Sequence, residues 1–178
     1  MITRGGFISS GAGFAASVPF VMSGKDDPVP NLRIGVLSDP HMKGEGSEEP
    51  FEKALRAFDR MKVDAVACCG DLATSGIVPE LERVGRAWNR VFPGNRRSDG
   101  APVANLFIYG DHDMGGYAWR ESKGIMPDDE LKKLSIPLND PGALWERCFG
   151  EKWSPVVVKE VKGYRFVLAH HQRFGRQR

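Results

Sequence analysis

The chain has 178 residues, of which 41% are hydrophobic and 27% charged, a balance typical of a globular protein and unlike that of a disordered one. Its 25 Lys and Arg residues nearly balance 23 Asp and Glu residues, so it lacks the basic excess that nucleic-acid-binding proteins usually carry. Three cysteines, an odd number, give no readable disulfide framework, and the length corresponds to about one domain.

Residues 1–23 have the pattern of a bacterial-type secretory signal peptide. A single basic residue, Arg4, precedes a stretch of small and apolar residues from Gly11 to Met22, and no acidic residue occurs before Asp26. The stretch is too short and too rich in small residues to span a membrane. We therefore expect an exported protein, periplasmic or extracellular, whose mature chain has no stable membrane insertion.

Part of this segment also resembles a twin-arginine export signal, whose pattern is Ser/Thr-Arg-Arg-x-Phe. Thr3, Arg4 and Phe7 fit that pattern, whereas Gly5 occupies the place of the second arginine. The alternative is a mobile Gly- and Ala-rich leader without a targeting role. Residues 24–31 are expected to form a linker to the folded domain.

Three short apolar runs, at residues 32–37, 63–69 and 103–109, have the length and composition of buried strands. Apolar residues at helical spacing predict a helix after each of the first two strands, one with Ser47 as its N-cap and one over residues 79–92. The resulting β-α-β-α-β order, with near-continuous apolar strands, predicts an α/β fold with a parallel sheet covered by helices.

The second half of the chain is less regular. Short helices are expected over residues 128–134 and 141–149. Residues 156–161 and 164–169 are predicted to form a β-hairpin, because two strand-like runs are separated by a two-residue turn.

Each of the three predicted parallel strands is followed by an acidic residue, Asp39, Asp71 or Asp111. The carboxyl ends of parallel strands share one edge of the sheet, where open α/β sheets bind ligands. His41 and His112 lie in the same segments, and carboxylate and imidazole groups bind divalent metals. A single Asp after a strand is more often a turn former, but the ordered set of three favours a metal site.

The three acidic segments have the sequences SDPH (38–41), GDLATSG (70–76) and GDHD (110–113). Together they resemble the calcineurin-like metallophosphoesterases, whose ordered motifs are Asp-x-His, Gly-Asp-x-x, Gly-Asn-His-Asp/Glu, a later His and a final Gly-His-x-His. The resemblance is strong over residues 32–113 and implies a metallophosphoesterase sandwich. Because no Gly-His-x-His follows, we expect residues 32–178 to be the N-terminal portion of such a domain, incomplete at its C-terminus.

The resemblance implies two metal ions, divalent or trivalent, and their mixed oxygen and imidazole ligands suit Mn, Fe or Zn. Asp39 and His41 would bind the first ion, and Asp71 would bridge both. Asp111 would bind the second ion in the place of the family's asparagine. The added negative charge at Asp111 should hold the metal more tightly and weaken its pull on an anionic substrate.

The resemblance assigns proton transfer to His112, beside the leaving-group oxygen, as a general acid or as a stabilising imidazolium, and its near-neutral pKa suits that role. Asp113 would orient His112. His170 and His171 could include the family's later His or could be a strand-end pair without a role, and they stay outside the predicted site.

These patterns predict a metal-dependent phosphoric ester hydrolase, in which a dinuclear metal centre activates water for attack on a phosphomonoester or phosphodiester. The expected partner is a small-molecule phosphoester, with no nucleic acid. The alternative is a non-catalytic or truncated metallophosphoesterase-like domain with an incomplete metal site.

Overall fold

The computed structural model describes residues 31–113 and 141–171. The predicted signal segment 1–23 and the predicted helix over 128–134 lie outside the described residues. Within the described parts of the chain, no helix has both the length and the apolar character needed to cross a membrane.

A parallel sheet forms the centre of the fold. Its strands are β1 (Ile34–Leu37), β2 (Ala65–Cys69) and β3 (Ala104–Ile108), and they lie side by side in the order β1-β2-β3. All three are paired in register from their first residues. Their carboxyl ends therefore meet at one edge of the sheet, as the sequence predicted.

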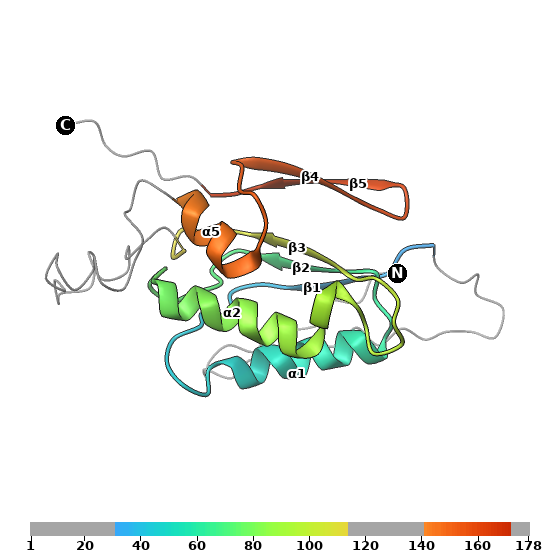
Figure 1. Cartoon of the computed structure of the whole chain (residues 1–178), viewed down its shortest axis with the longest axis horizontal. Coiled ribbons are helices and arrows are strands. Elements are labelled where there is room, and N and C mark those ends of the chain that lie inside the picture. The colour runs from blue at the N-terminus through green and yellow to red at the C-terminus, as the bar shows by residue number, and fades with distance from the viewer. Residues whose placement is uncertain (1–30, 114–140, 172–178) are drawn as a thin grey trace, which may run out of the picture.

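Two helices cover one face of this sheet, α1 (Glu48–Arg60) and α2 (Val78–Val91), and a short 3-10 turn, Pro93–Asn95, follows α2 (Figure 1). Both helices lie within about two residues of their predicted positions. Ser47 precedes α1 as expected, but its hydroxyl makes no cap bond to the helix and donates to the Gly44 carbonyl instead.

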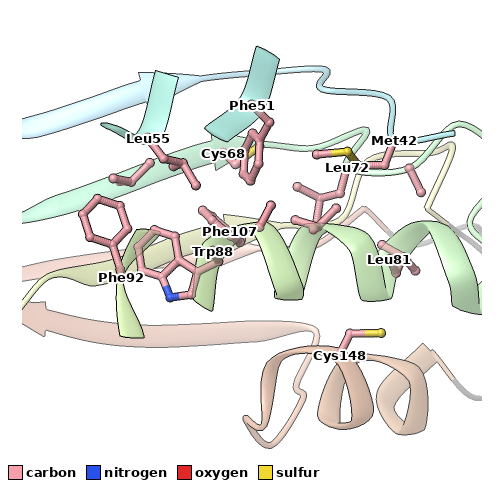
Figure 2. Packing of buried hydrophobic residues seen from close by; sticks show 14 of the residues in the cluster. Met42, Phe51, Leu55, Cys68, Leu72, Leu81, Trp88, Phe92, Phe107 and Cys148 are labelled. Atoms are coloured by element: carbon pink, nitrogen blue, oxygen red, sulfur yellow. The ribbon is translucent and has the colours of Figure 1, made fainter. Parts of the chain in front are cut away.

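The main core lies between the sheet and the helices (Figure 2). On β2, Cys68 is fully buried in it while its neighbour Cys69 is exposed, because successive side chains of a strand point to opposite faces. From β3, Phe107 packs edge-on against Trp88 of α2, with 5.2 Å between ring centroids. Burying a side chain of this size contributes about 1.5–3 kcal/mol, so these contacts fix the helices on the sheet.

The predicted hairpin is confirmed as β4 (Val156–Val161) and β5 (Tyr164–Ala169). Its two turn residues, Lys162 and Gly163, have φ values of 50° and 82°, as a tight type I′ turn requires. Val161 and its neighbours pack in a second, smaller apolar cluster with Ala65 and Leu106, residues that alternate with the helix-facing ones. The hairpin therefore packs against the sheet face opposite α1 and α2 (Figure 1).

A third helix, α5 (Pro141–Phe149), confirms the prediction for residues 141–149 and packs against α2. Gly85 of α2 makes this packing close, because a Cβ atom at that position would collide with the carbonyl oxygen of Cys148. The described residues thus form an α/β fold with a parallel core, consistent with the predicted metallophosphoesterase architecture.

Candidate metal centre

The segments after β1 and β2 fold tightly against each other. The amide of Asp39 donates to the Gly70 carbonyl at 3.2 Å, and the amide of His41 donates to the Asp71 carbonyl at 3.0 Å. Asp39, His41 and Asp71 all have positive φ, at 56°, 44° and 48°. Such conformations cost non-glycine residues roughly 1–3 kcal/mol each and persist where the surrounding structure requires them, often at functional sites.

Two glycines allow the ends of β2 and β3 to approach. A Cβ atom on Gly70 would lie only 2.9 Å from the Cα atom of Gly110. A Cβ atom on Gly110 would collide with the carboxylate of Asp71. The glycines of the two motifs therefore make room for Asp71 at the centre of the site.

The structure brings the predicted ligands together in two groups. Atoms of Asp39, His41 and Asp71 that could bind a metal all lie within 4.8 Å of one another, and the same holds for Asp71, Asp111 and His112. Asp71 belongs to both groups, which is the position that a bridging carboxylate needs. His112, predicted to transfer protons, is also placed where it could ligate.

The charges of this cluster favour the binding of a cation. Three carboxylates converge, and among the described residues no lysine or arginine forms an ion pair with Asp39, Asp71 or Asp111; the Nε2 atom of His41 lies 3.9 Å from Asp71 Oδ2. Two like charges about 4 Å apart repel by roughly 4 kcal/mol near a protein surface. Carboxylate oxygens and imidazole nitrogens are ligands for Mn, Fe and Zn, so the donor set fits the predicted metals.

The ring of His112 is held by a backbone carbonyl. Its Nδ1 atom lies 2.7 Å from the carbonyl oxygen of Thr74, and because a carbonyl only accepts, Nδ1 carries the hydrogen. This hydrogen bond, with the charges of Asp71, Asp111 and Asp113, raises the pKa of His112 above its ordinary value. Sequence reasoning missed Thr74, because a contact made by a main-chain oxygen leaves no residue-type signature.

Asp113 is buried, with 1% of its surface exposed, and its carboxylate accepts three backbone hydrogen bonds. The donors are the amides of Leu72 at 3.0 Å, Ala73 at 2.7 Å and Gly110 at 2.8 Å. Burial raises the pKa of Asp113 to about 7. Asp113 therefore ties the segments after β2 and β3 together, and its direct orientation of His112 stays a prediction.

The structure places His170 in an aromatic core. Its ring packs edge-on against Trp145, with 4.6 Å between ring centroids, and its Nδ1 atom accepts a hydrogen bond from the amide of Tyr109 at 3.0 Å. Burial lowers the pKa of His170 to about 4, so the ring is neutral. His171 is exposed, and its amide donates to the Tyr109 carbonyl. The pair fastens the end of β5 to the end of β3.

Comparison with models of known protein families gives a match over most of the chain. The family model described as calcineurin-like phosphoesterase matches residues 32–177, which is most of the chain. No curated protein matches the sequence at a significant level.

Proposed function

Because the chain belongs to the calcineurin-like phosphoesterase family, we propose that it hydrolyses phosphomonoesters or phosphodiesters of small molecules with a dinuclear metal centre. The observation that carries the proposal is the place of Asp71 in both groups of potential ligands. Asp39 and His41 would complete one site, and Asp111 the other. Two bound ions would supply Lewis acidity towards the phosphoryl oxygens and lower the pKa of an attacking water.

His112 would deliver the proton that the leaving group needs. Since Nδ1 is held by the Thr74 carbonyl, the proton that a protonated ring can transfer is the one on Nε2. The raised pKa of His112 increases the protonated fraction near neutral pH, which suits a general acid. The same positive charge would stabilise the negative charge that develops on the leaving oxygen.

The proposal is tested by measuring hydrolysis of p-nitrophenyl phosphate and bis(p-nitrophenyl) phosphate with added Mn²⁺, Fe²⁺ or Zn²⁺. Asp71→Asn should lower kcat at least about a hundredfold, because it removes a charge shared by both ligand groups. Glu160→Gln on the exposed surface of β4 is the matched control and should keep full activity. Equal rates for Asp71→Asn and the control would contradict the proposal.

A non-catalytic metallophosphoesterase-like domain with an incomplete metal site is the second candidate. It is favoured by one observation, that the four histidines of the given sequence are His41, His112, His170 and His171, and none of them lies in a Gly-His-x-His segment. This candidate predicts that the protein turns over neither substrate and does not retain two tightly bound metal ions in elemental analysis.

We also propose that the protein is exported, on the signal-like composition of residues 1–23. A fusion of residues 1–30 to a leaderless periplasmic reporter enzyme should be active outside the cytoplasm of a bacterial host. A reporter that stays in the cytoplasm would contradict export.

A further inference from the structure

Another buried carboxylate near the candidate site, Glu80, lies in the first turn of α2 and is 4% exposed. It belongs to neither ligand group. Its carboxylate accepts a hydrogen bond from the amide of Ser75 at 2.7 Å. Burial raises the pKa of Glu80, while the amides of Ser75, Ile77 and Gly76 oppose that shift. Burying an acid is costly unless it is hydrogen-bonded, and the amides of this segment supply the hydrogen bonds that compensate the cost.

That segment, residues 72–77, is called the Thr74 loop here and lies directly on the candidate site. Gly76, with φ of 63°, packs so closely on the third motif that a Cβ atom there would lie 2.6 Å from the carbonyl oxygen of His112. Asp113 holds the first two amides of the loop, and Glu80 holds the amide of Ser75. Two buried carboxylates thus hold the loop, Asp113 at its first two residues and Glu80 at Ser75.

Between these two carboxylates, Thr74 contacts both histidine motifs. Its amide donates to the Met42 carbonyl at 2.9 Å, and its Oγ1 donates to the His41 carbonyl at 2.9 Å. Its carbonyl accepts from Nδ1 of His112. The loop therefore fixes the backbone beside one predicted ligand and the ring of the predicted acid.

Glu80 and His112 bind the two ends of one peptide unit. The Ser75 amide that donates to Glu80 and the Thr74 carbonyl that accepts from His112 belong to the same planar group, whose N–H and C=O point in opposite directions. Hydrogen bonds in such a chain polarise one another. A negative charge at the amide end makes the carbonyl end a stronger acceptor.

We propose that Glu80 is a positioning residue that orients and polarises His112 through the peptide unit joining Thr74 and Ser75. The arrangement is an acid–histidine pair with one peptide group placed between its members. The kinetic consequence rests on the proposed hydrolase function, whereas the contact itself can be tested without turnover.

The contact is tested by NMR on the wild-type protein and on Glu80→Gln, without metal. The wild type should show a scalar coupling across the hydrogen bond between His112 Nδ1 and the Thr74 carbonyl carbon. In Glu80→Gln, which keeps shape but removes charge, the His112 Nδ1 proton should move upfield, because the carbonyl becomes a weaker acceptor. Glu82→Gln is the control, since Glu82 lies on the same helix and pairs with Arg147 at the surface.

The kinetic arm compares the same variants. Glu80→Gln should lower kcat by roughly five- to tenfold with KM within about twofold, because charge-assisted hydrogen bonds are about twice as strong as neutral ones. Metal content should stay at the wild-type level. A missing coupling in the wild type, or a Glu80→Gln variant that matches the Glu82→Gln control in the Nδ1 proton shift, overturns the proposal. Absence of turnover in the wild type would count against the hydrolase function alone, because the NMR arm still decides the contact.

Discussion

At the scale of single residues, the site depends on glycines, which have no side chain, as much as on charged residues. Gly110 has no Cβ atom where the Asp71 carboxylate lies, and Asp71 is the residue that both ligand groups share. The glycine is thus part of the candidate metal centre although it offers no ligand atom. Replacing this glycine should therefore lower metal affinity more than it lowers the stability of the fold.

Gly110→Ala should displace the Asp71 carboxylate and lower metal affinity at both sites by at least about tenfold, as loss of a ligand or its supporting residue does. Metal content after dialysis, measured by elemental analysis, checks this. Gly44→Ala is the matched control, because a Cβ atom at Gly44 meets nothing within 4 Å. If the Gly110→Ala protein retains the metal content of the control, the prediction is wrong, because the Asp71 carboxylate can then bind metal without the space beside Gly110.

The acids and histidines of the site could be predicted from sequence, because their residue types and their order after the strands carry the metal chemistry. The contacts that orient them could not. The Thr74 carbonyl belongs to the main chain, and Glu80 looks in the sequence like any acidic residue in the first turn of a helix. Their roles depend on how closely the Thr74 loop packs on the third motif, which only the folded chain determines.

At the scale of elements, the end of β5 is fastened to the end of β3 by a histidine that must stay neutral. His170 accepts a hydrogen bond from Tyr109 and is buried, which lowers its pKa from 6.5 to about 4. Nearby Lys159 also lowers this pKa, and Glu151 raises it. Between pH 6.5 and 4 the unfolded chain therefore binds more protons at this residue than the folded one.

His170 should thus contribute stability above pH 6.5 that is lost as the pH falls towards 4, by an amount on the order of 3 kcal/mol. Asp113, whose pKa is raised to about 7, contributes in the opposite direction over nearly the same range. To separate the two contributions, the free energy of unfolding in urea is measured for the wild type and for His170→Asn at pH 7.5, 6, 5 and 4. The quantity compared is the wild-type value minus the variant value at each pH. This difference should shrink on acidification, and a constant difference would contradict a neutral buried ring.

The strands and α-helices of the described residues could be predicted from sequence within about two residues. Continuous apolar runs marked the strands, helical spacing marked α1 and α2, and the Lys162 and Gly163 turn marked the hairpin. The predicted cap hydrogen bond of Ser47 does not form, because its hydroxyl donates to the Gly44 carbonyl instead of accepting from a helix amide. The position of the hairpin over the second sheet face also depends on long-range packing that no local pattern encodes.

At the scale of the whole molecule, the described fold places helices on one face of a parallel sheet, a hairpin on the other, and all three motif segments at one edge (Figure 1). The apolar layers hold the strands in register, so the three acids after them converge. Convergence of like charges is unfavourable without a cation, and Asp71 lies where one carboxylate could serve two. This arrangement supports the proposal that Asp71 would be a ligand to both ions of a metal pair.

Electron paramagnetic resonance of the protein loaded with two equivalents of Mn²⁺ tests this claim most directly. If Asp71 is a ligand to both ions, they would lie close enough for exchange coupling, and the wild type should show the multiline signal of a coupled manganese pair. Asp71→Asn should lose that signal, while Glu160→Gln should keep it. A spectrum of isolated Mn²⁺ ions in the wild type, with both equivalents bound, would contradict the bridged pair.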